Sequence, residues 1–197
     1  MATPFSARVV PRKHGGEARV RLARSGDAAA MLAVDRGVVD AGVGVVLSRR
    51  DLPRHAAEQV DRLRPTLEGD PRMGALLVVE VPPPGSSVGL AAPGLVVGHG
   101  SAHRYRPSLC QHVAVIALGI RPDHQGQGLG RALLEGLVDW CEGAGVERVE
   151  LTVLADNGRA QALYESSGFQ REAVRGRFVK HRDGRYVDDI MMARWLR

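Results

Sequence analysis

The chain has 197 residues, 44% of them hydrophobic, which fits one globular domain with a substantial core. No apolar run approaches the roughly 20 residues that a membrane-spanning helix needs, and the first residues lack the apolar core of a signal peptide. The two cysteines, Cys110 and Cys141, provide no disulfide framework and are typical of a reducing compartment, so we expect a cytoplasmic protein with no membrane contact.

The chain carries a net charge of +5, and its basic residues gather in the first 24 positions and in Arg171–Arg185. Arginine clusters of this kind can neutralise phosphates and so drive nucleic-acid binding. Aromatic residues make up only 4% of the chain, which leaves no stacking surface for single strands. The composition therefore argues against a nucleic-acid partner.

The N-terminal part begins with little regular pattern. Residues 1–17 contain Pro, Arg and Gly without hydrophobic periodicity, so we expect a basic, flexible tail there. Ala18–Ala23 alternates as a strand does. Ser25 or Asp27 is then placed to cap a helix that reaches about Arg36.

The next stretch predicts one helix and two strands. Val38–Leu47 is broken by glycines and stays ambiguous, whereas Asp51–Leu67 has apolar or small residues at helical spacing. Ala75–Val81 and Leu95–His103 predict strands, joined by a Pro- and Gly-rich hairpin loop around Pro82–Gly94.

The most informative segment is the hexapeptide Gln125–Gly130, which reads Gln-Gly-Gln-Gly-Leu-Gly. It joins an apolar strand at His112–Ile120 to an amphipathic helix at Leu129–Glu142. Alternating glycines let the backbone approach a ligand because no Cβ intervenes. The first amides of the helix are unpaired and lie at the positive end of its dipole, so the junction predicts a phosphate or pyrophosphate site.

Two common phosphate-binding turns do not fit this hexapeptide. A mononucleotide P-loop ends in Gly-Lys-Ser/Thr, but Gly130 is followed by Arg131 and Ala132. A Rossmann turn needs its third glycine where Arg131 stands, and it opens an early βαβ unit instead of lying two-thirds along the chain. A flexible connector without a ligand stays open on the hexapeptide alone.

A second motif follows about thirty residues later. Val149–Phe169 reads VELTVLADNGRAQALYESSGF, an alternating strand followed by a short helix between Asn157, a natural N-cap, and Gly168, a natural C-cap. The chain closes with Val174–Lys180 and Tyr186–Ala193, which predict two strands around an Asp-Gly turn.

Together the two motifs resemble the GNAT superfamily of acetyl-CoA-dependent N-acyltransferases. The family pattern Arg/Gln-x-x-Gly-x-Gly/Ala is matched by Gln125, Gly128 and Gly130, and the second family motif by Asn157 and its helix. The resemblance covers about His112 to Trp195. It implies an α/β (α+β) fold with a mixed, mostly antiparallel sheet of six to seven strands and about four helices, as one domain over residues 18–197.

The same resemblance implies an acyltransferase of class EC 2.3.1. Such an enzyme moves an acetyl group from acetyl-CoA directly to a primary amine in a ternary complex. The acceptor is a small molecule such as an amino acid, or a protein N-terminus or lysine. The C-terminal stretch from Arg182 to Arg194 is similar to a bacterial subgroup that acetylates small amines. Asp183, Asp188 and Asp189 could attract a cationic amine, and equally fit a solvated hairpin.

The cofactor site is also implied by the resemblance. Arg131 could add a contact to the pyrophosphate or simply face solvent, and Asn157 could contact pantetheine, cap its helix, or both. Coenzyme A is polyanionic, so part of the net charge would serve it. The implied binding residues are Leu118, Gly119, Ile120, Gln125, Gly126, Gln127, Gly128, Leu129, Gly130, Arg131 and Asn157.

Catalysis requires a neutral amine, a stabilised oxyanion and a protonated leaving thiolate. By resemblance Tyr164 is the general acid at the CoA sulfur, with a core-packed tyrosine as the alternative. The acidic residue that related enzymes carry on the strand is replaced here by Val115. His112, Glu150 acting through water, or water alone are therefore the candidates for the base.

The missing acid keeps a second class of function open, a catalytically silent acyl-CoA-binding sensor or interaction module. Cys141 lies in a helix interior without a nearby histidine and is expected to be a core residue, not a nucleophile. The seven histidines show no paired ligand spacing, so no metal is expected. A homodimer is an open possibility.

Overall fold

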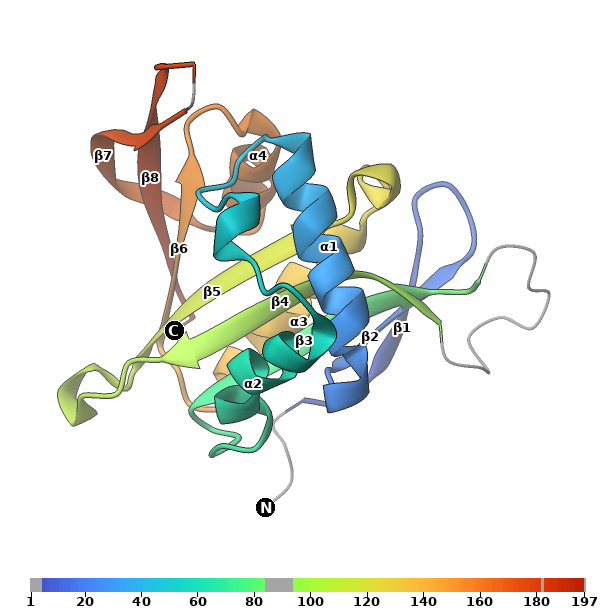
Figure 1. The fold of residues 1–197 in the computed structure, drawn as a ribbon. Helices are drawn as coiled ribbons and strands as arrows, with labels where there is room; N and C mark the ends of the chain where they lie inside the picture. The colour runs from blue at the N-terminus through green and yellow to red at the C-terminus, as the bar shows by residue number, and fades with distance from the viewer. Residues whose placement is uncertain (1–4, 84–93, 182, 197) are drawn as a thin grey trace.

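The computed structural model describes residues 5–83, 94–181 and 183–196. Its strands form one sheet of eight within these residues, in the order β1-β2-β3-β4-β5-β6-β8-β7 (Figure 1). The strands are β1 (Arg8–Pro11), β2 (Glu17–Leu22), β3 (Gly74–Val81), β4 (Leu95–Arg104), β5 (Val113–Ile120), β6 (Arg148–Leu154), β7 (Gln170–Lys180) and β8 (Tyr186–Trp195). Neighbouring strands are antiparallel except β5 and β6, which are parallel. The expected α+β fold with a mixed, mostly antiparallel sheet is confirmed.

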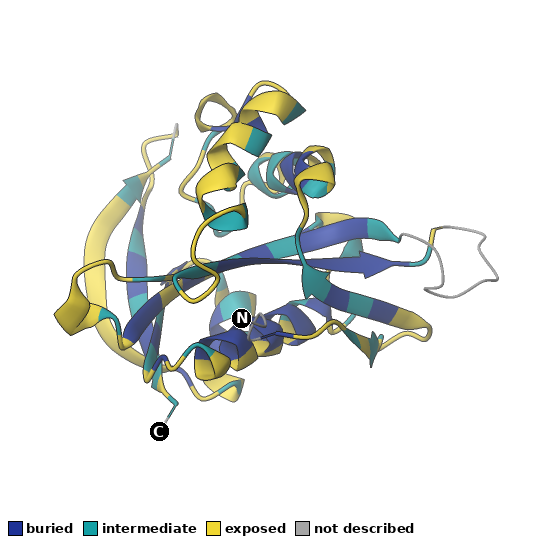
Figure 2. Ribbon diagram, turned by 90° about the horizontal axis from the view of Figure 1, so that it is seen from below, coloured by how far each residue is buried: buried dark blue, intermediate teal, exposed yellow. Residues whose placement is uncertain are grey.

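Helices cover both faces of the sheet (Figure 2). The long helices are α1 (Ala28–Ala41), α2 (Ala56–Leu67), α3 (Leu129–Gly143) and α4 (Gly158–Ser166). Both faces of the sheet are apolar at β3, because side chains alternate between the two faces of a strand. Leu77 and Val79 belong to the core beneath α3, whereas Leu76 and Val78 pack with Met31 of α1. None of the helices in the described residues is long and apolar enough to span a bilayer.

The expectation of a flexible tail is wrong for Arg8–Pro11, which form β1. This strand pairs antiparallel with β2, from Arg8 opposite Val20 to Pro11 opposite Glu17. Arg8 also forms an ion pair with Asp139 of α3. Four residues are too few to show a periodicity, so the pairing is visible only in three dimensions. It adds the eighth strand to the six or seven expected.

The ends of two helices also differ from expectation. The first helix continues past Arg36 to Ala41 and ends at Gly42, whose left-handed conformation (φ +68°) stops it. The second helix begins at Ala56 and not at Asp51, which lies in a short 3₁₀ turn. Most of the expected hairpin loop at Pro82–Gly94 lies outside the described residues.

A buried carboxylate ties β2 to β3. The Glu80 side chain is fully buried and forms ion pairs with Arg19 and Arg21 of β2. Arg21 donates two further hydrogen bonds of 2.8 Å to Asp27, just before α1. A buried charge is tolerated only when it is paired in this way. The cluster therefore fixes the start of α1 against the sheet.

We predict that Glu80→Gln lowers the free energy of unfolding by about 3 kcal/mol, because two guanidinium groups lose their buried partner. Asp61→Asn is the matched control, since Asp61 pairs with Arg64 at the surface, and it should change stability by less than about 0.5 kcal/mol. Urea denaturation measures both. Equal losses in the two variants would contradict the importance of the buried pair.

Candidate active site

The parallel strands β5 and β6 pair over a short distance and then part. Their register runs from Val113 opposite Arg148 to Val115 opposite Glu150. Beyond this point β5 stays paired with β4 as far as Ile120, and β6 with β8 as far as Leu154. Residues 116–120 therefore have one edge without a strand partner in the described sheet. Backbone groups on such an edge need partners from elsewhere. These groups alternate along a strand, and the Arg121 amide donates to Val97, next to β4. Those of Leu118 and Ile120 therefore point to the free edge, and those of Gly119 point to β4.

The hexapeptide lies just past the end of this edge, as expected from the sequence. After a 3₁₀ turn at Pro122–His124 the chain passes through Gly126 (φ +81°) and Gly128 (φ +85°), and α3 begins at Leu129. Both glycines are exposed and adopt the left-handed conformation that side chains disfavour. The turn thus presents exposed backbone at the N-terminus of a fifteen-residue helix.

Protein groups hold both glutamine side chains of the turn. Gln125 donates to the carbonyl of Ile120 (3.0 Å) and accepts from Arg159 of α4 (3.2 Å). Gln127 accepts from Arg12 (Nε, 3.0 Å), and its carbonyl accepts from the Lys13 amide (3.0 Å). Sequence reasoning missed Arg12, Lys13 and Arg159, because no spacing rule links residues more than thirty positions away to the turn.

Arg131 makes a contact within the protein. Its guanidinium donates to the hydroxyls of Ser166 (2.7 Å) and Ser167 (3.4 Å), at the end of α4. The side chain therefore links α3 to α4 in this structure.

The second motif forms α4 as expected. The Asn157 side chain accepts from the Ala160 amide (3.1 Å) and caps the helix. Its amide nitrogen also fills the space beside Gly44 in the loop after α1, where a Cβ would lie only 2.0 Å away. Tyr164 is 8% exposed and packs against Phe169, with ring centroids 6.0 Å apart. Burial raises the pKa of Tyr164 to about 12, so the phenol stays protonated at physiological pH.

The two candidate bases occupy different places. Glu150 lies opposite Val115, at the last pair before the strands part, where it accepts from Arg148 (2.8 Å) and from the Tyr105 hydroxyl (3.4 Å). His112 is exposed and precedes β5, at the end opposite the turn. At about 3.3 Å per residue, His112 lies about 10 Å along the strand from Val115, the last residue of β5 that is paired with β6. The structure therefore brings Glu150, and not His112, to the opening between the strands.

A polar pair lies beneath the unpaired part of β5. His99 of β4 is opposite Gly119, and its Nε2 is 2.7 Å from Asp35 of α1. Val38, one turn later on α1, lies 3.6 Å from where a Cβ of Gly119 would be. The pair thus holds α1 over this part of the sheet. No sequence motif pointed to it.

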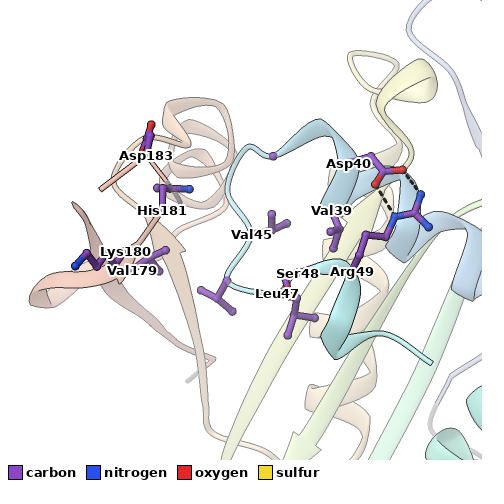
Figure 3. A pocket seen from close by; sticks show the side chains of 12 residues that line it. Val39, Asp40, Val45, Leu47, Ser48, Arg49, Val179, Lys180, His181 and Asp183 are labelled. Carbon is purple, nitrogen blue, oxygen red and sulfur yellow. Dashed lines mark hydrogen bonds and ion pairs between the residues drawn. The ribbon is translucent and has the colours of Figure 1, made fainter. Parts of the chain in front are cut away.

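A cleft of about 590 Å³ opens between the loop after α1 and the hairpin that joins β7 to β8 (Figure 3). One wall carries Asp40, which forms an ion pair with Arg49 (Nε–Oδ1, 2.6 Å). On the other wall, His181 has a buried Nε2 without a hydrogen-bond partner among the described residues. The lining is Val39, Asp40, Gly42, Val45, Val46, Leu47, Ser48, Arg49, Val179, Lys180, His181 and Asp183.

Only one of the three hairpin aspartates lines this cleft. Asp183 does so, whereas Asp189 is buried and accepts from Arg175 (2.8 Å). Asp188 accepts from the backbone amide of Arg177 (2.6 Å), which has a positive φ of 53°. These two aspartates therefore shape the hairpin.

The cysteines differ in environment. Cys141 is buried, and burial raises the pKa of its thiol to about 12, which makes it a poor nucleophile. Cys110 is exposed. Within the described residues no group of three or more potential metal ligands comes together.

Comparisons with known proteins identify relatives of this chain. The chain is 49% identical over 76 residues to the [ribosomal protein bS18]-alanine N-acetyltransferase of Escherichia coli K12, covering 39% of this chain and 51% of that enzyme. It is 33% identical over 102 residues to the L-amino acid N-acetyltransferase AaaT of the same strain, covering 51% of this chain and 62% of that enzyme. The chain thus spans about half the length of the first of these relatives.

Solved structures extend the likeness to most of the fold. A GNAT superfamily phosphinothricin acetyltransferase from Sinorhizobium meliloti, solved with acetyl-CoA, superposes with a TM-score of 0.75 at 22% identity, covering 91% of this chain and 88% of that one. The family model described as "Acetyltransferase (GNAT) family" matches residues 54–169, which include the glycine turn and α4. This chain belongs to the GNAT family of acetyltransferases.

Proposed function

We propose that the chain is an N-acetyltransferase of class EC 2.3.1, which moves an acetyl group from acetyl-CoA to a primary amine in a ternary complex. One observation carries the proposal. The unpaired edge of β5 leads directly into the glycine turn at the start of α3, and the Gln125 side chain joins the two by its bond to Ile120. A ligand with an amide-containing arm and a pyrophosphate fits this combination.

In this proposal the backbone amides of Gln125–Gly130 bind the pyrophosphate, because they are exposed at the positive end of the α3 dipole. The amide groups of the pantetheine arm then pair with the free edge of β5 at Leu118 and Ile120, on either side of Gly119. Asn157 lies at the start of α4 and contacts the arm while it caps the helix.

The proposed reaction is a direct transfer. The amine lone pair attacks the thioester carbon, a C–N bond forms, and the C–S bond breaks. Tyr164 gives its proton to the departing sulfur, and its pKa of about 12 keeps the phenol protonated until that step. The amine loses a proton through water to Glu150, at the opening between the strands. The products are an acetamide and CoA.

We propose the cleft between the α1 loop and the β7–β8 hairpin as the acceptor site. Its volume of about 590 Å³ lies within the range of small-molecule pockets. The unpartnered Nε2 of His181 and the carboxylate of Asp183 offer an acceptor and a negative charge to a cationic amine. The names of the relatives point to amino acids and protein N-termini as the acceptors to test.

Thiol release from acetyl-CoA, measured over a panel of amino acids, small amines and N-terminal peptides, tests the proposal. Turnover with any of these acceptors supports the assignment as an N-acetyltransferase and identifies the class of substrate. The second candidate is a silent acyl-CoA sensor, which the apolar Val115 at the opening favours. Tight acetyl-CoA binding with no turnover over the whole panel would establish the sensor instead.

We predict that Tyr164→Phe lowers kcat about 100-fold, because the leaving thiolate loses its proton donor. The dissociation constant for acetyl-CoA should stay within twofold, since the ring is retained. The raised pKa keeps the phenol protonated as pH rises, so ionisation of Tyr164 should not reduce wild-type kcat below about pH 11. Full turnover in the variant would remove Tyr164 from the mechanism.

We predict that Glu150→Gln lowers kcat about 100-fold across the pH–rate profile, because the proton acceptor is lost. His112→Ala is the control from the far end of β5, and its profile should match the wild type. A shifted profile in His112→Ala with a normal Glu150→Gln enzyme would reverse the assignment.

We predict that alanine is costly at one glycine of the turn and tolerated at another. Gly128→Ala should cost about 1 kcal/mol of stability and weaken acetyl-CoA binding, since alanine disfavours the left-handed φ of +85°. Gly130→Ala should be tolerated, because a Cβ there meets Leu163 at an ordinary 3.5 Å. Thermal unfolding and calorimetric titration with acetyl-CoA measure both effects. Equal behaviour of the two variants would contradict the special conformation at Gly128.

A further inference from the structure

The hairpin between β1 and β2 reaches the glycine turn, more than a hundred residues away in sequence (Figure 1). The hairpin closes on itself through the Arg12 amide and the Gly16 carbonyl (3.0 Å). Its tip then binds Gln127 twice. The Lys13 amide donates to the Gln127 carbonyl (3.0 Å), and the Arg12 guanidinium donates to the Gln127 side-chain oxygen (Nε, 3.0 Å).

The backbone contact determines where one donor of the turn points. A trans peptide is planar, and its C=O and N–H groups point in opposite directions. Because the carbonyl of Gln127 faces the hairpin, the amide of Gly128 in the same peptide faces away from it. Gly128 is the N-cap of α3, so this amide belongs to the set of donors proposed to bind the pyrophosphate.

The side-chain contact adds charge next to the turn. Arg12 holds Gln127 and Arg159 holds Gln125, so each glutamine is bound by an arginine from a distant segment. In the described part of the chain neither guanidinium forms an ion pair with a carboxylate. Burial lowers the pKa of His124, and the positive charges of Arg121 and Arg12 lower it further, although Asp123 opposes them. Arg12 and Arg159 thus bring two guanidinium groups to the turn that no described carboxylate pairs with.

We propose that the β1–β2 hairpin is a clamp for the glycine turn, and that Arg12 is a positioning residue for pyrophosphate binding. The Lys13 amide orients the Gln127–Gly128 peptide so that the Gly128 amide faces the ligand. Arg12 acts through the Gln127 side chain, by holding that residue against the hairpin tip. The proposal rests on the proposed use of acetyl-CoA. It assigns a role to the segment that the sequence suggested was a loose tail.

Arg12→Ala and Lys13→Ala form a matched pair that tests the clamp. Each removes one positive charge from the same hairpin tip. Only Arg12 uses its side chain on Gln127, whereas Lys13 uses its backbone amide, which alanine retains. Arg12→Ala should raise the KM for acetyl-CoA about tenfold with little change in kcat. Lys13→Ala should change it less than twofold.

S-acetylpantetheine, a donor without the pyrophosphate, separates positioning from a general structural defect. With this donor Arg12→Ala should turn over as the wild type does, because the turn is not used. Gln127→Ala removes the same bond from the other side and should reproduce the higher KM. The double variant should add no further loss, since the two side chains act together.

Three results would overturn the clamp. These are an unchanged KM in Arg12→Ala, an equal rise in both hairpin variants, or an equal loss with S-acetylpantetheine. Failure of the proposed function has a different signature, because the wild-type protein would then show no turnover of acetyl-CoA with any acceptor. Gln127→Ala keeps the test decisive if Arg12→Ala does not fold.

Discussion

The parting of β5 and β6 is the constraint on which the rest of the site depends. A parallel pair that stops after three residues leaves hydrogen-bonding groups on β5 without a strand, a cost that a folded sheet normally avoids. The strands can part because each is held on its other side, β5 by β4 and β6 by β8. The antiparallel pairing with β4 and with β8 thus holds the two strands in place where they do not pair with each other.

The helices on the two faces of the sheet contribute different parts of the candidate site. On one face α3 and α4 bring the glycine turn and Tyr164 to β5, over the larger core. On the other face α1 is fixed by the Glu80 cluster at its start and by the His99–Asp35 pair further along. The loop that follows α1 then lies opposite the β7–β8 hairpin and forms the cleft. In the proposed reaction the donor and the acceptor therefore approach the opening from different structural layers.

The sequence predicts the parts of the site that are encoded locally. The strand-turn-helix at Gln125–Gly130 and the Asn157 cap were both correct, because glycine conformations and caps are set by neighbouring residues. What could not be predicted depends on pairing across the fold. The sequence predicts a tail where β1 forms, and the Arg12–Gln127 bond joins residues 115 apart. His181 lines a cleft only because the loop after α1 lies opposite it.

The contact between Asn157 and Gly44 limits which substitutions the loop after α1 can accept. A side chain at position 44 would collide with the cap of α4, so the loop after α1 cannot change there without disturbing α4. The next residues, Val45 to Ser48, line the cleft and are free of that collision. In the proposed enzyme, substrate preference can therefore change through those four side chains, while Gly44 has to stay a glycine beside the cap of α4.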